Sequence, residues 1–182
     1  MSWLTIIANL LAILSLVALG LVVLLVVAWF LRRGGSDRLG LGELDERAWL
    51  TLATVVAGIA MAGSLYFSEV VHFVPCQLCW YQRIAMYPQV LLLGMAALRR
   101  DIGIRPYAMA MSLIGAAIAL YHVIIQRFPS LSTGACSADA PCTAINLEVF
   151  GFVTIPFLAL SAFLLIFALL LVARPVDDEV AA

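Results

Sequence analysis

The stretch Pro75-Cys76-Gln77-Leu78-Cys79-Trp80-Tyr81-Gln82-Arg83 sets two cysteines directly before a long apolar run. The other two cysteines of the chain, Cys136 and Cys142, lie in a later polar connection. A free cysteine inside an apolar helix packs as a small hydrophobe, but thiols confined to polar connections can reach water and each other. Exchange between such pairs needs only thiolate attack through a mixed disulfide. The first hypothesis is therefore redox chemistry at a membrane surface.

The composition is that of a membrane protein. Hydrophobic residues make up 65% of the chain and charged residues 12%, whereas soluble domains are about 45–50% apolar. A hydrocarbon core about 30 Å thick is crossed by about 20 apolar helical residues. Five segments are long enough: residues 3–31, 49–71, 80–98, 107–125 and 150–173. We predict an all-α polytopic membrane protein, a four-helix transmembrane bundle plus one extra N-terminal transmembrane helix.

Four parts follow from this pattern. Residues 1–31 are predicted to be a retained transmembrane anchor, because the apolar run is too long for a signal peptide and arginines follow it. Residues 32–48 read as a glycine-rich cytoplasmic connector, residues 49–173 as the four-helix membrane domain, and residues 174–182 as a flexible tail. Both cysteine pairs lie within residues 49–173, so we expect the first span to be dispensable for the chemistry.

Arginine placement predicts the orientation in the membrane. The chain has no lysine, and along an alternating five-span path only Arg83 and Arg127 fall on the side of the cysteine loops. The other side holds Arg32, Arg33, Arg38, Arg47, Arg99, Arg100, Arg105 and Arg174. The positive-inside rule makes the arginine-rich side cytoplasmic. Both cysteine loops are then extracytoplasmic, where disulfides form and persist. The net charge of −1 argues against a nucleic-acid partner.

The first cysteine pair and Arg83 favour a reactive thiol beside a fixed positive charge. Proline favours a helix start, so Pro75 places Cys79 in or near a first helical turn, where backbone N–H groups favour a thiolate. Arg83 follows one turn deeper, and an arginine inside a membrane helix indicates a functional role by default. The alternatives are that Cys76 and Cys79 are half of a zinc site, with the other two cysteines and His72 as further ligands, and that Arg83 only snorkels to lipid head groups.

Taken together, residues 75–83 resemble the signature of the DsbB/BdbC disulfide bond formation proteins, in which C-x-x-C is followed by an aromatic residue and then by arginine. The likeness covers about residues 49–173 and includes the second cysteine pair. It implies a membrane bundle that reoxidises a thioredoxin-like thiol oxidase (DsbA/BdbD-like) and passes the electrons to a quinone, ubiquinone or menaquinone. The protein would reside in the cell (plasma or inner) membrane, in contact with lipid and the quinone pool.

The resemblance also implies roles for single residues. Cys136 would be attacked by the partner's thiol, Cys142 would then attack the Cys76–Cys79 disulfide, and the electrons would reach Cys79 and the quinone, with Arg83 at the quinone. The spacing between Cys136 and Cys142 is short, which leaves open which of them is attacked first. His122, in an H-x-x-x-Q-x-x-P pattern, is similar to a family histidine near the quinone. On residues alone it equally suits an interfacial hydrogen bond.

Three alternatives remain at this point. The Cys136–Cys142 pair could be a static disulfide that staples its loop. A vitamin K epoxide reductase-like protein also places C-x-x-C at a membrane quinone, but there the loop cysteines precede the motif, whereas here Cys76 and Cys79 come first. A non-enzymatic metal-binding membrane protein is the third alternative, although we predict no metal.

Overall fold

The structure is a computed structural model that describes residues 3–33, 45–132, 136 and 140–173. Residues 34–44 of the predicted connector and the predicted tail, residues 174–182, lie outside the described residues. In chain order the helices and strands are α1 (Trp3–Arg33), α2 (Glu46–Leu65) with its π-helical extension (Tyr66–Val70), α3 (Gln77–Arg99), a 3-10 turn (Ile102–Ile104), α4 (Arg105–Arg127), a second 3-10 turn (Pro129–Leu131), β1 (Glu148–Val149), β2 (Val153–Thr154) and α5 (Ile155–Val172).

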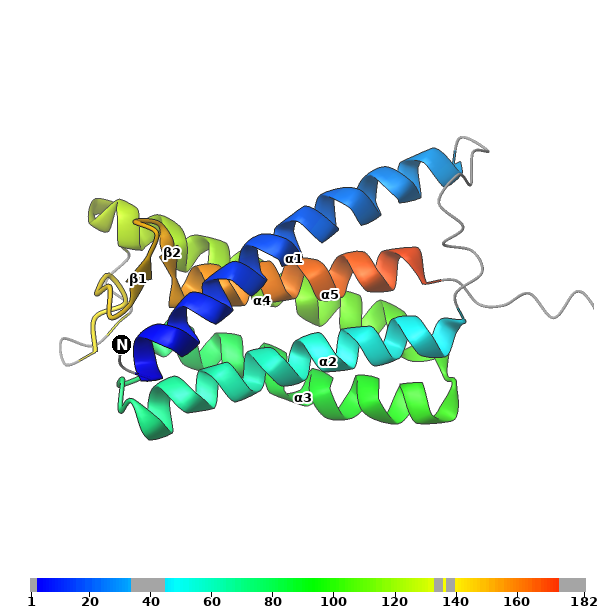
Figure 1. The fold of residues 1–182 in the computed structure, drawn as a ribbon, viewed down its shortest axis with the longest axis horizontal. Helices are drawn as coiled ribbons and strands as arrows, with labels where there is room; N and C mark the ends of the chain where they lie inside the picture. Colours follow the sequence, from blue (N-terminus) through cyan, green and yellow to red (C-terminus); the bar gives the residue numbers. More distant parts are fainter. Residues whose placement is uncertain (1–2, 34–44, 133–135, 137–139, 174–182) are drawn as a thin grey trace, which may run out of the picture.

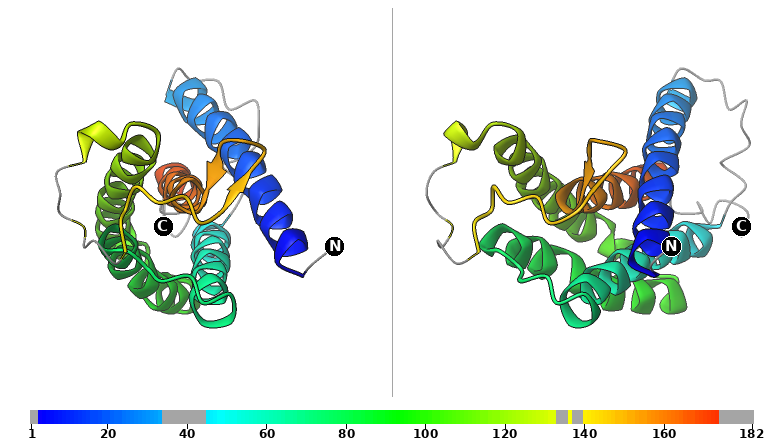
Figure 2. Two further views of the ribbon diagram at one scale, coloured as in Figure 1. Left: turned by 90° about the vertical axis from the view of Figure 1, so that its left-hand side faces the viewer. Right: turned by 60° about the vertical axis from the view of Figure 1, so that its left-hand side comes forward.

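The helices form a bundle of four with a fifth helix laid across its outside. Helices α2 to α5 run alongside one another, and α1 crosses α5 at an angle (Figure 1). The end-on view shows α1 outside the ring formed by the other helices (Figure 2). The predicted all-α polytopic membrane fold is confirmed.

Helix α3 differs from the other four in composition. Helices α1, α2 with its extension, α4 with its preceding turn, and α5 are long and apolar enough to cross a membrane. Helix α3 matches them in length but carries Gln82, Arg83 and Gln89, and both glutamines are buried inside the bundle. The Gln89 amide donates to the Ala85 carbonyl (2.9 Å) and accepts from Ser112 Oγ on α4 (2.9 Å). The polar groups of Gln89 therefore face protein rather than lipid.

Small residues allow two close helix contacts. A Cβ atom on Gly115 of α4 would collide with the ring of Phe163 on α5, a residue that is fully buried. Most of the buried residues of α1 are also small: Ala8, Ala12, Ser15, Ala18 and Ala28. Small residues let helix backbones approach closely in membranes, which explains how α1 packs along α5.

The start of the last span was predicted wrongly. The apolar run begins at Phe150, but α5 begins at Ile155, because residues 148–154 form a β-hairpin. Phe150 and Gly151 both have positive φ (54° and 75°), as in a type I′ turn. Arg127 ties the hairpin to the end of α4 through Glu148 (2.9 Å) and the Gly151 carbonyl (3.1 Å). A hydrophobicity count does not detect a tight turn among apolar residues.

Candidate redox site

The two cysteine pairs meet at one end of the bundle. Cys76 is the N-cap of α3, directly after Pro75, and Cys79 lies in the first turn of that helix. Cys142 follows α4 and packs in one buried cluster with Cys76 and Ile125, against which Cys79 and Cys136 also pack. Cys76 and Cys142 are 7% and 2% exposed, so both are shielded from bulk water. The four cysteines thus form one local group, although the pairs are separated in sequence.

The two pairs differ in redox state. Cys136 and Cys142 form a disulfide, with their Cα atoms 5.9 Å apart. Cys76 and Cys79 are free, but their sulfur atoms are only 3.0 Å apart. The arrangement therefore places one oxidised pair and one reduced pair in the same packed cluster, as exchange between them requires.

His122 stands between the two pairs. Its Nε2 atom is 3.0 Å from the Cys142 carbonyl oxygen and 3.7 Å from Cys76 Sγ. The side-chain amide of Gln82 lies 3.2 Å from Nδ1. If that amide donates to Nδ1, the proton of the neutral ring sits on Nε2, which donates to the Cys142 carbonyl. One turn further along α4, Gln126 donates to the Ala144 carbonyl (3.0 Å). His122 and Gln126 together hold the second cysteine loop against α4.

The environment of the first pair favours a thiolate at Cys76, whereas the sequence predicted it at Cys79. The pKa of the Cys76 thiol is lowered, first because the Cys79 thiol can donate a hydrogen bond to its sulfur and further because His122 lies beside it. Burial opposes this shift, since desolvation disfavours the charged form. The net effect is that the first proton of the reduced pair leaves at a lower pH than from an isolated cysteine.

Arg83 is anchored by the end of α2. Its Nε and Nη2 atoms donate to Ser64 Oγ and to the Ser64 carbonyl, each at 3.0 Å. The π-helical turn that begins at Tyr66 widens the helix just beyond Ser64. Tyr87 also donates to Ser64 Oγ (3.2 Å), and the guanidinium lies over the Trp80 ring at 5.2 Å. A guanidinium has five N–H donors, so these two bonds do not exhaust it.

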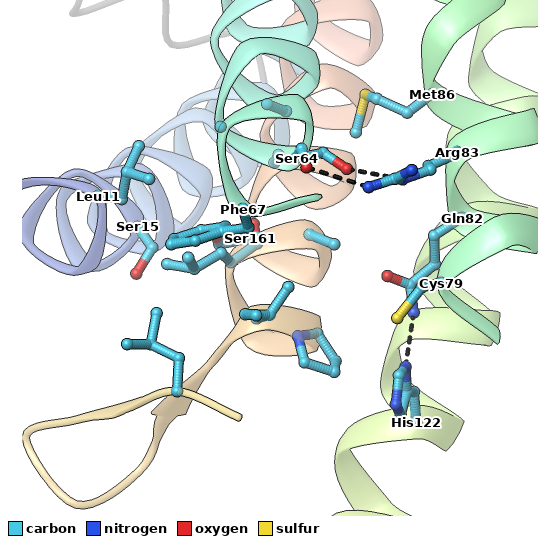
Figure 3. Close-up of a pocket in the computed structure, with 18 of the residues that line it drawn as sticks. Leu11, Ser15, Ser64, Phe67, Cys79, Gln82, Arg83, Met86, His122 and Ser161 are labelled. Atoms are coloured by element: carbon cyan, nitrogen blue, oxygen red, sulfur yellow. Dashed lines mark hydrogen bonds between the residues drawn. The ribbon is translucent and has the colours of Figure 1, made fainter. Parts of the chain in front are cut away.

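A cavity of about 560 Å³ opens beside these residues, within the 300–1,000 Å³ typical of small-molecule sites. Its polar end is lined by Cys76, Cys79, Gln82, Arg83 and His122. Figure 3 shows Cys79, Gln82, Arg83 and His122 on one side of the space, with Phe67 and Ser161 across from them. The rest of the lining is largely apolar and comes from α1, α2, α5 and the two loops that carry the cysteines, with Met86 and Tyr87 of α3. The cavity could hold a lipophilic ring with its reactive end at Cys79.

Comparison with known proteins identifies the family. The sequence profile described as "Disulfide bond formation protein DsbB" matches residues 46–173. The chain belongs to the DsbB family. Its relatives include "Disulfide bond formation protein C" of Bacillus subtilis strain 168, which is 50% identical over 119 residues, 65% of this chain and 86% of the relative. A "Probable disulfide formation protein" of Oceanobacillus iheyensis is 48% identical, over 69% of this chain and 88% of its own. No solved structure matches this chain.

The resemblance drawn from residues 75–83 is therefore confirmed. The structure also gathers all six site residues that the sequence singled out around one end of the bundle. Cys76, Cys79, Arg83 and His122 line the cavity, whereas Cys136 and Cys142 lie beside it in the cysteine cluster.

Sequence reasoning missed three polar partners in this DsbB-family site. They are Ser64, which holds Arg83; Gln82, which holds His122; and Gln126, which holds the loop after Cys142. Gln82 and Gln126 had a detectable signal, because each is a polar residue inside an apolar helix. Ser64 had none, since serine in a membrane helix commonly bonds within its own helix.

Among the described residues, one group of three side chains is close enough together to hold a metal ion. Ligand atoms of Cys76, Cys79 and His122 lie within 4.8 Å of one another. The histidine beside these two cysteines is therefore His122, and not His72 as the zinc-site alternative from the sequence expected. Two thiolates on a tetrahedral zinc, each about 2.3 Å from the metal, stand about 3.8 Å apart. The sulfur atoms of Cys76 and Cys79 are closer together than that, at 3.0 Å.

Proposed function

We propose that this DsbB-family protein is a disulfide-generating oxidoreductase of the cell membrane. It reoxidises a thioredoxin-like, DsbA/BdbD-like thiol oxidase outside the cytoplasm and delivers the electrons through two cysteine pairs to ubiquinone or menaquinone. The observation that carries the proposal is the Cys136–Cys142 disulfide packed in one cluster with the free Cys76–Cys79 pair. Around them, the cavity supplies an apolar chamber with cationic and thiol groups at one end.

The proposed electron path follows the order of burial. A partner thiolate attacks the disulfide at Cys136, which is less buried than Cys142, and Cys142 leaves as a thiolate. Resolution by the partner's second thiol releases the oxidised partner and leaves Cys136 reduced. Cys142 then attacks Cys76 in the oxidised form of the first pair, and Cys79 leaves as a thiolate on the cavity side. Attack of Cys136 on Cys142 resolves this mixed disulfide, which re-forms the Cys136–Cys142 bond and leaves Cys76 and Cys79 reduced. Each dithiol oxidised sends two electrons and two protons toward the cavity.

His122 is proposed to assist the transfer between pairs. Its Nε2 atom lies 3.0 Å from the Cys142 carbonyl oxygen and 3.7 Å from Cys76 Sγ, the atom that Cys142 must attack. Donation to the Cys142 carbonyl holds the attacking residue in place. Donation to a Cys76 thiolate stabilises the charge when that pair is reduced. His122 also lines the cavity, so this role is compatible with the quinone-side position implied by the family resemblance.

The residues at the polar end fit a quinone. Arg83 can donate to a carbonyl oxygen while it remains anchored to Ser64. Apolar side chains of α2 and α5 suit a lipophilic ring. A bound quinone supplies a two-electron, two-proton acceptor, and the protein supplies its position against Cys79.

A purified-protein assay tests the proposed function. The protein in detergent should oxidise many equivalents of a reduced thioredoxin-like dithiol only when quinone is present, and the quinone absorbance should fall in step. Metal analysis of the same sample serves as the control for the metal-binding alternative. Quinone-independent behaviour together with stoichiometric bound zinc would contradict the proposal.

The proposed orientation rests on the arginine distribution. Arg83 and Arg127, on the cysteine side, both have specific partners: Ser64 for Arg83, and Glu148 and Gly151 for Arg127. They therefore do not oppose the positive-inside rule. An impermeant thiol reagent applied to intact, reduced cells should label Cys136 or Cys142. Labelling that appears only after lysis would invert the orientation.

A further inference from the structure

Helix α1 lies outside the matched family region, which begins at residue 46, yet it lines the cavity. Leu11, Leu14, Ser15, Ala18 and Leu21 of α1 all face that space. They recur at three- and four-residue steps, which places them on one face of the helix. The helix that is additional to the family unit is therefore a wall of the chamber that serves the cysteines.

The cavity has two distinct regions. Its polar end is made by Cys79 and Arg83 of α3 with His122 of α4, and its apolar arm runs between α1, α2 and α5. Leu11 and Ser15 of α1 appear on the side of the space away from Cys79 and Arg83 (Figure 3). A molecule with a redox-active ring at the polar end would extend any apolar tail into this arm.

Helix α1 is seated closely enough to shape the arm. It packs on α5 through small buried residues, including Ala12 and Ser15, which are 0% and 5% exposed. Near the cysteine end it approaches α2, where a Cβ atom on Gly63 would stand 3.3 Å from Leu11 Cδ1. Helix α1 therefore packs along α5, meets α2 at Leu11 and borders the arm on one side.

We infer that α1 forms a binding subsite for the isoprenoid tail of the quinone. The inference rests on the proposed function, which places the quinone ring at Cys79 and Arg83. One cavity contains both that ring position and the apolar arm, and most of the side chains along the arm are hydrocarbon. Thiol exchange itself does not involve α1. The first span is thus dispensable for thiol chemistry but determines which quinones bind well.

Substitutions in the full-length chain test this assignment. Ser15→Trp should fill the arm, and Ser15→Leu should narrow it with less disturbance of the α5 contact. Leu10→Trp is the matched control, because Leu10 is 55% exposed and does not line the cavity. The probes are a quinone with a long isoprenoid tail and its counterpart with the same ring and no tail.

Both Ser15 variants should raise the KM for the tailed quinone, by about tenfold for the tryptophan, and leave the KM for the tail-less quinone unchanged. Leu10→Trp should leave both values unchanged. Equal changes for the two quinones, or no change for either, would overturn the tail subsite, because the tail would then not contact α1. If the wild-type protein reduces neither quinone, the proposed function itself fails, which is a different result from loss of tail discrimination.

Discussion

Serine at Cys76, Cys79, Cys136 or Cys142 is expected to reduce quinone-linked oxidation of the partner dithiol to background. A hydroxyl group cannot form or exchange a disulfide, so each substitution interrupts the path at a different sulfur atom. The rate of partner oxidation with quinone as acceptor is the measurement. Thr143→Ser, next to Cys142 in the same loop, is the control and should retain the wild-type rate.

Removing both Cys136 and Cys142 tests whether this pair carries electrons or only holds its loop. If it carries electrons, the double variant Cys136→Ser with Cys142→Ser loses partner oxidation, while the Cys76–Cys79 pair still reacts with quinone. Near-normal oxidation of the partner by this double variant would show that the Cys136–Cys142 disulfide is purely structural. That result would contradict the transfer between pairs that their shared cluster suggests.

Arg83→Ala is expected to weaken quinone use by one to two decades in KM. The lost interaction is a hydrogen bond from a charged donor, worth about 1.5–3 kcal/mol, and each 1.4 kcal/mol is about tenfold. Arg83→Lys keeps the charge but loses the planar donor group that bonds Ser64 twice, so we expect a milder defect. Steady-state titration with quinone measures both effects.

Two controls distinguish quinone binding by Arg83 from its other possible roles. Arg127→Ala removes an arginine at the same end that pairs with Glu148 outside the cavity, and it should leave the quinone KM unchanged. Exchange between the two cysteine pairs needs no quinone and should survive in Arg83→Ala. An unchanged quinone KM and turnover in that variant would assign Arg83 to lipid head groups instead.

The sequence predicted the helical architecture, and it singled out Cys76, Cys79 and Arg83 as candidates, because both depend on local patterns. Long apolar runs indicate spans whatever their neighbours, and Cys76, Cys79 and Arg83 lie within one or two helical turns of each other. The start of α5 was missed because Phe150 and Phe152 are as apolar as the helix that follows, and only the backbone shows that they belong to a hairpin.

Contacts between helices could not be predicted in the same way. Ser64 lies 19 residues before Arg83, and His122 lies 46 residues after Cys76. Which polar groups meet across such distances depends on the rotation and depth of each helix, and a single sequence does not specify either. The contribution of α1 to the cavity is of the same kind, because it depends on how an otherwise uniform apolar helix is seated against α5.

Anaerobic titration of the fully reduced protein with quinone tests the central claim most directly. Four thiols on one connected path release four electrons as two disulfides form, so the wild-type protein should consume about two equivalents of quinone. The double variant Cys136→Ser with Cys142→Ser should consume about one. No consumption by the wild-type protein, or equal consumption by both proteins, would contradict a path that joins the two pairs to the quinone.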